Sequence, residues 1–238
     1  MFESLTLLSL GEGGWGMALL EGAVVTIALA LACVPIGIPL GLLLATAANA
    51  DNRLPRALAT VFSTVFRGLP ELLTLLIVYY GCQIGLQKLM AHWGFTTEIS
   101  INAFMAAVIA LSLVLAAFSS EVWQGAFKTI SKGQHEASQV LGLSRRQAFF
   151  KVILPQLMRI SLPGLSNNWL SLLKDTSLVS TISIVDLMRQ TSLAVSSTKQ
   201  PMLFYLAACL IYLFFSTVSG FFIAKAEAHF SLDRPSRA

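Results

Sequence analysis

Four polar side chains stand inside or at the edges of apolar runs: Arg67, Glu121, Asn168 and Asp175. Ionisable groups are costly in a hydrocarbon environment, so each charged one is a candidate for function. The carboxylates of Glu121 and Asp175 suit a cationic group, whereas the guanidinium of Arg67 matches a carboxylate. The sequence shows no nucleophile–base pair and no metal-ligand set. These residues therefore predict a site that binds a polar solute without catalysis.

Each of these side chains also has a structural alternative. The alternative partners are Lys128 for Glu121, Lys174 for Asp175 and Glu71 for Arg67. Arg67 and Glu71 are four residues apart and approach only if a helix continues through Pro70, which disfavours one. Asn168 could line a cavity or form hydrogen bonds between helices. The residues alone leave these alternatives open.

A polar, basic insert separates two apolar runs over residues 128–155 and reads KTISKGQHEASQVLGLSRRQAFFKVILP. Residues Gln134–Leu141 favour a helix, and Gly142 is a suitable stop. Ser144 followed by Gln147 matches a capping box, which opens a second helix. A helix of about eight residues is marginal in water. We therefore expect two short helices that meet at Gly142 and pack either in a partner's groove or on the inner leaflet.

The elements that must position these residues are membrane spans. Hydrophobic residues make up 55% of the 238-residue chain and charged residues only 12%. The apolar runs are long enough to cross about 30 Å of hydrocarbon. The predicted spans are Glu21–Ala48, Ala57–Leu86, Asn102–Trp123, Val152–Leu173 and Gln200–Ala224. The composition thus predicts an all-α polytopic membrane protein with about five transmembrane helices, forming a single domain over residues 1–238.

Two of the predicted spans carry marked irregularities. Gly37 and Gly41 form a G-x-x-x-G pair in the first span, which permits close contact with another helix. The second span is interrupted by FRGLPELL at residues 66–73, where Pro70 and two charges fall inside the apolar run. The segment after residue 173 is polar enough to leave the lipid or line a cavity.

Basic residues gather in alternate connectors. The formal net charge of +4 could suggest a nucleic-acid partner, but its distribution argues against one. Arg53 and Arg56 lie in one connector, many others lie in the insert, and Lys225 lies in the tail. The positive-inside rule then predicts an external (periplasmic) N-terminus and a cytoplasmic C-terminus, which requires an odd number of spans.

Three segments resemble a known family of transport proteins. Glu136-Ala137, then Gly142, then Ile153-Leu154-Pro155 resemble the EAA motif of permease subunits from bacterial ATP-binding-cassette (ABC) importers. FRGLPELLTLLIVYYG at residues 66–81 and LPGLSNNWLSLLKDTSLVS at residues 162–180 are similar to segments of the polar amino acid uptake subgroup. The whole pattern is most similar to Q-type permeases for histidine, basic amino acids and opines. Ser138 departs from a common second alanine.

The resemblance implies a multi-subunit importer in the bacterial inner membrane. Its expected partners are a second, M-type permease, two cytoplasmic ATPase subunits that bind ATP and Mg²⁺, and a periplasmic solute-binding protein. The ATPases would dock on the insert, through residues that include Glu136, Ala137, Leu141, Gly142 and Pro155. This chain has no phosphate-binding G-x-x-x-x-G-K-[ST] loop, so we expect a transport subunit with no cofactor of its own rather than an enzyme.

The expected solute is a polar or basic amino acid, or an amino-acid-derived opine such as octopine or nopaline. Its ammonium or guanidinium would bind Glu121 and Asp175, and its carboxylate would bind Arg67. An alternative from another class is a stand-alone ion-coupled carrier or channel. The absence of inverted repeats and the few acids inside the spans count against that alternative.

Overall fold

The computed structural model describes residues 6–11, 13–93 and 102–231, and no strand occurs among them. The helices are α2 (Gly16–Ala48), α3 (Arg53–Gly68), α4 (Glu71–His92), α5 (Ala103–Thr129), α6 (Lys132–Val140), α7 (Arg145–Ala148), α8 (Leu154–Asp175), α9 (Leu187–Thr198) and α10 (Pro201–Ser231), with a π-helical turn η1 (Phe149–Ile153) and a 3-10 helix η2 (Thr176–Ile182). The predicted all-α class is confirmed. The predicted domain bounds at residues 1 and 238 lie outside the described residues.

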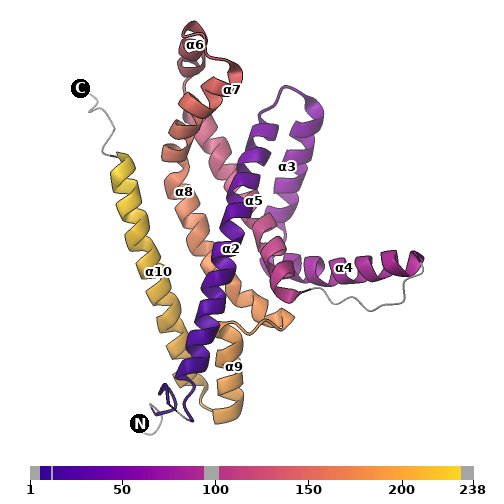
Figure 1. The fold of residues 1–238 in the computed structure, drawn as a ribbon, viewed down its shortest axis with the longest axis vertical. Coiled ribbons are helices and arrows are strands. Elements are labelled where there is room, and N and C mark those ends of the chain that lie inside the picture. The colour runs from indigo at the N-terminus through magenta and orange to yellow at the C-terminus, as the bar shows by residue number, and fades with distance from the viewer. Residues whose placement is uncertain (1–5, 12, 94–101, 232–238) are drawn as a thin grey trace.

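Most of the long helices follow the long axis of the molecule, whereas α4 crosses it (Figure 1). Figure 1 shows α2, α3, α5, α8 and α10 running along this axis and α4 running across it. Among the described residues, α2, α4, α5 and α10 are long and apolar enough to cross a membrane. The beginning of α2 and the end of α10 lie at opposite ends of the molecule (Figure 1). The odd number of crossings stays a prediction, since four of the described helices meet the criteria of length and hydropathy.

The second predicted span breaks into two separate helices. Helix α3 ends at Gly68, Leu69 is extended with a ψ of 142°, and α4 begins after Pro70. Proline disfavours the helical conformation in the residue before it and supplies no backbone N–H. The predicted interruption is confirmed as a full break, after which α4 runs crosswise to the long axis and projects sideways from the bundle (Figure 1).

Helices α2 and α5 form the closest pair in the bundle. A Cβ atom at Gly37 would lie 2.6 Å from Leu115 Cδ2, and one at Gly41 would lie 2.7 Å from Ser119 Cβ. Trp123 Nε1 donates a hydrogen bond of 3.3 Å to the carbonyl oxygen of Ile38. The close contact that the G-x-x-x-G pair permits is therefore present, because only glycine lets α5 approach this closely.

Helix α8 also packs closely against α5. A Cβ atom at Gly164 would lie 2.6 Å from Val122 Cγ1, so this approach also depends on a glycine. Leu172 and Leu173 of α8 are buried together with Leu111 of α5 in one apolar core. The two helices are thereby held in a fixed register, which brings the end of α8 beside the middle of α5.

Candidate functional site

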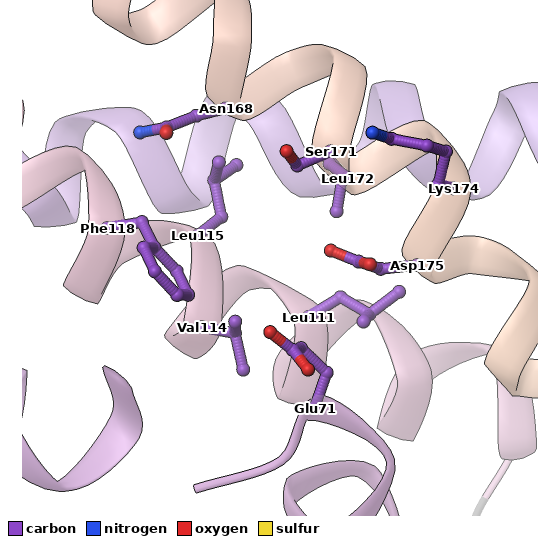
Figure 2. Close-up of a pocket in the computed structure, with 10 residues that line it drawn as sticks. All are labelled: Glu71, Leu111, Val114, Leu115, Phe118, Asn168, Ser171, Leu172, Lys174 and Asp175. Atoms are coloured by element: carbon purple, nitrogen blue, oxygen red, sulfur yellow. The ribbon is translucent and has the colours of Figure 1, made fainter. Parts of the chain in front are cut away.

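An open cavity of about 310 Å³ lies where the beginning of α4 and the end of α8 meet α5. Its lining is polar on the α4 and α8 side and apolar on the α5 side (Figure 2). The lining residues are Glu71 from α4, Leu111, Val114, Leu115 and Phe118 from α5, and Asn168, Ser171, Leu172, Lys174 and Asp175 from α8. The predicted residues Asn168 and Asp175 are thus brought together.

Local structure fixes the polar groups of this cavity. Glu71 is the first residue of α4, directly after Pro70, so the break between α3 and α4 places its carboxylate at the cavity. Asp175 ends α8, where the chain tightens into η2. The Asn168 amide donates a hydrogen bond of 3.4 Å to Ser119 Oγ, which orients the amide between α8 and α5.

The charge of the cavity is negative. The carboxylates of Glu71 and Asp175 point toward one another across it (Figure 2). Asp175 interacts electrostatically with Glu71, which repels it, and with Lys174, which attracts it. Two carboxylates and one ammonium leave a formal charge of −1 in the lining. Such an arrangement favours a cationic group, because a cation between the carboxylates relieves their repulsion.

Arg67 and Glu121 lie outside the cavity lining and form an ion pair with each other. Their side chains are 39% and 56% exposed. Nearby, the hydroxyls of Ser63 and Ser120 share a buried hydrogen bond of 2.9 Å, which joins α3 to α5. The suggested pairings of Arg67 with Glu71 and of Glu121 with Lys128 are therefore wrong, because α3 ends before Glu71 and delivers Arg67 to α5.

The insert forms the two short helices that the sequence predicts, at the end of the bundle (Figure 1). Helix α6 is capped at Leu141, and Gly142 has a positive φ of 73°. Ser144 and Gln147 form the predicted capping box at the start of α7, with hydrogen bonds of 3.0 and 3.3 Å. The bend at Gly142 is confirmed. Its left-handed backbone explains why glycine stands there.

The outer face of α6 is free of contacts with the rest of the described chain. Glu136 and Ala137 are exposed, and Val140 and Leu141 are 88% and 76% exposed. An apolar pair this exposed at the tip of a polar insert is typical of a surface that a partner covers.

The inner face of α6 is anchored to the bundle. Ser138 is buried and donates a hydrogen bond of 2.7 Å to the Gln134 carbonyl oxygen. Gln156 of α8 donates one of 3.2 Å to the Gln134 side chain. Pro155 lies in the first turn of α8, directly after η1. The Gln156–Gln134 hydrogen bond thus joins α6 to α8, the helix that carries Asn168 and Asp175.

Sequence reasoning missed several residues that line the cavity. Glu71 was considered only as a partner of Arg67, and Ser171 and Phe118 were not considered. The available signal was an acid directly after Pro70 inside an apolar run, since a charge there needs a polar environment. Within the described residues, no group of three or more His, Cys, Asp or Glu side chains could hold a metal ion.

The sequence matches a family described as binding-protein-dependent transport system inner membrane component, over residues 37–230. The chain belongs to this family and is an inner-membrane transport subunit. Three similar proteins are permeases. The histidine/lysine/arginine/ornithine permease HisQ of Escherichia coli is 35% identical over 92% of this chain and 96% of its own. The octopine permease OccQ of Rhizobium meliloti is 36% identical over 94% of each chain. The arginine permease ArtQ of Haemophilus influenzae is 40% identical over 88% of this chain and 91% of its own.

Solved structures agree with this assignment. A chain of an amino acid ABC transporter crystallised with histidines superimposes with a TM-score of 0.75 at 27% identity, covering 90% of this chain and 95% of that one. An inward-facing MetNI methionine ABC transporter gives a TM-score of 0.65 at 16% identity, over 90% and 94% of the chains, and supports the fold alone. The fold is that of an ABC importer transmembrane domain.

Proposed function

We propose that this chain is a permease subunit that moves polar or basic amino acids, or opines such as octopine and nopaline, by alternating access. The observation that carries this proposal is the cavity in which Glu71 and Asp175 face each other (Figure 2). An amino acid carries an ammonium group, and arginine-derived solutes add a guanidinium; both are attracted to paired carboxylates. Relatives named for basic amino acids and octopine support the same solute class.

The cavity offers a distinct partner for each part of such a solute. Asp175 and Glu71 would bind the cationic group, and Asn168 and Ser171 would hydrogen-bond to its polar atoms. Phe118 and the leucines of α5 would contact its aliphatic part. The cavity volume of about 310 Å³ lies at the lower end of the range usual for small-molecule sites.

Ligand roles for Arg67 and Glu121 remain part of this proposal. Glu121 stands three residues after Phe118 on α5, on the same face of the helix and further toward the insert. Exposed ion pairs contribute only about 0–1 kcal/mol, so this one can open at little cost. Once open, Arg67 would bind the carboxylate of the solute and Glu121 its ammonium.

Energy for transport would enter through the exposed face of α6. Two partner ATPase subunits, which would bind ATP and Mg²⁺, would dock on Glu136, Ala137 and Leu141. Gly142 would set the bend between α6 and α7, and Pro155 would begin the helix that leads to Asp175. ATP-driven closure of the ATPases would shift the population of inward- and outward-open permease through this contact.

The proposed orientation places α6, α7 and the connector between α2 and α3 in the cytoplasm, since these basic segments lie at one end of the molecule (Figure 1). The N-terminus would be periplasmic, facing a solute-binding protein. Residues 1–238 would form one permease domain. Its exposed apolar side chains, such as Ile77 and Phe221, would face lipid or an M-type permease.

Reconstitution tests this function directly. The chain, its M-type partner, the ATPase and the binding protein are placed in proteoliposomes, and uptake of labelled arginine, histidine, octopine and nopaline is measured. We expect uptake that needs ATP and the binding protein. Uptake by this chain alone, driven by an ion gradient, would show a stand-alone carrier and contradict the proposal.

A further inference from the structure

A second polar cluster lies away from the acidic cavity, where η2 and α9 pack on α2 and α10 packs on α9. It contains Thr26 of α2, Thr176 of η2, Asp186 before α9 and Tyr212 of α10. Thr26, Thr176 and Asp186 are all 0% exposed. Apolar side chains of α2, α9 and α10 surround the cluster, so bulk water does not reach it.

Most of the polar atoms in this cluster have partners within the protein. Asp186 Oδ1 accepts a hydrogen bond of 2.9 Å from the Arg189 backbone N–H. Thr26 Oγ1 accepts one of 3.2 Å from the Leu187 N–H and donates one of 3.0 Å to the Gly22 carbonyl oxygen. Thr176 Oγ1 donates one of 2.6 Å to a backbone carbonyl oxygen of α8.

Within this cluster, two buried side-chain atoms have no hydrogen-bonding partner among the described residues: Asp186 Oδ2 and Tyr212 Oη. The Tyr212 hydroxyl lies beside those of Thr26 and Thr176 without reaching hydrogen-bonding geometry, and it interacts electrostatically with Asp186. An unpaired buried polar group typically costs about 1–3 kcal/mol. Two such groups at one place are therefore a reason to look for a shared ligand.

The chemistry of the two atoms restricts what that ligand is. Asp186 Oδ2 requires a donor, and the Tyr212 hydroxyl has a proton to donate. Burial raises the pKa of Asp186 to about 6, although the Arg189 N–H donates to it. The donors within the protein therefore do not replace the hydration that this carboxyl group loses.

A water molecule fits both requirements, because it accepts one hydrogen bond and donates two. A monovalent cation would satisfy Asp186 Oδ2 but would leave the hydroxyl proton of Tyr212 unpaired. An anion would be repelled by the carboxylate. We propose that Asp186 Oδ2 and Tyr212 Oη bind one buried water molecule, which joins α10 to the N-terminus of α9.

This bridge has a consequence for the acidic cavity. Thr176, which borders the cluster, directly follows Asp175, which lines the cavity. The water molecule would hold α10 against the segment that begins at Asp175 and ends at Asp186. It would thereby support the position of η2 without contacting a transported solute.

A double-mutant cycle on the complete transporter in nanodiscs tests the bridge. Tyr212→Phe removes one hydroxyl, and Asp186→Ser keeps a capping oxygen for Arg189 while removing Oδ2. We expect each variant to lower the Tm by about 2–4 °C, as loss of about 1 kcal/mol does in a chain of this size. The double variant should lower it by about as much as either single variant, since both remove the same bridge.

The matched control is Tyr205→Phe on the same helix. The Tyr205 side chain is 45% exposed, so this variant should leave the Tm unchanged. A high-resolution map should show density for one water between Asp186 and Tyr212, and this density should vanish in Tyr212→Phe. Additive losses of Tm in the double variant would overturn the proposal, and so would a direct bond between Asp186 and Tyr212 with no intervening density. A Tm that rises with NaCl relative to choline chloride in wild type but not in Asp186→Ser would also overturn it, because it would indicate a bound sodium ion.

Discussion

Asp175 combines two properties that rarely occur together in a membrane helix: it is charged, and it faces another carboxylate, Glu71, across an open cavity (Figure 2). Such an arrangement is unfavourable for stability, because like charges repel and the neighbouring Lys174 compensates only one of them. A bound cation would remove the repulsion. This is why we propose that these two residues bind a cationic solute and release it when the cavity changes shape.

Removal of either carboxylate should weaken binding of a cationic solute. A charge-assisted hydrogen bond contributes about 1.5–3 kcal/mol, and 1.4 kcal/mol corresponds to a tenfold change. Asp175→Asn and Glu71→Gln should each raise the Kd for arginine in the solubilised complex by about tenfold to a hundredfold. The matched control is Asp51→Asn, an exposed carboxylate outside the cavity, which should bind arginine like wild type. Unchanged binding in both cavity variants would exclude this site.

At the scale of the element, the bend between α6 and α7 depends on one backbone conformation. Gly142 has a φ of 73°, which disfavours residues with a Cβ atom by about 1–2 kcal/mol. A Cβ atom there would meet nothing within 4 Å, so the penalty is conformational and not steric. The angle between α6 and α7 thus depends on a single glycine.

Substitutions at Gly142 should act according to how well they tolerate the left-handed region. Gly142→Val should reduce ATP-driven uptake severalfold, and Gly142→Asn should retain much more, because asparagine adopts this conformation readily. Gly133 of α6 provides the control: its φ is not positive, and Gly133→Ala should leave uptake near wild type. Membrane insertion of all three variants is checked by immunoblot. Equal uptake by the Val and Asn variants would show that the backbone conformation is not what matters.

At the scale of the whole molecule, the charges and the fold agree on one topology. The connector between α2 and α3, the insert and the end of α10 lie at one end of the bundle, and α9 lies at the other (Figure 1). The basic residues are concentrated at the first of these ends. Under the positive-inside rule, a solute would enter at the α9 end and leave at the α6 end.

Labelling of single cysteines should confirm this orientation. In a background without Cys33, Cys82 and Cys209, Ser197→Cys marks α9 and Asp51→Cys marks the connector between α2 and α3; both positions are exposed. A membrane-impermeant maleimide should label Ser197→Cys in spheroplasts at once. It should label Asp51→Cys only after the membrane is permeabilised. The reverse pattern would mean that the protein is inserted the other way round.

Local patterns in the sequence predicted the long apolar helices and the two helices of the insert, but not α9. The apolar runs predicted the long helices, and Pro70 predicted the interruption between α3 and α4. Gly142 and the Ser144–Gln147 capping box predicted the two helices of the insert. These signals act over a few residues of the chain, since helix propensity, capping and backbone conformation depend on near neighbours.

The partners of the charged residues were decided only by the tertiary structure. Arg67 pairs with Glu121, which is 54 residues away, and Glu71 faces Asp175 because α4 runs crosswise to the long axis (Figure 1). The buried meeting of Asp186 with Tyr212 likewise depends on how α10 packs. Such contacts follow from the register and crossing of packed helices, here fixed by the close approach of α5 at Gly41 and Gly164. No short stretch of sequence contains that information, because each contact joins segments that meet only after the bundle has formed.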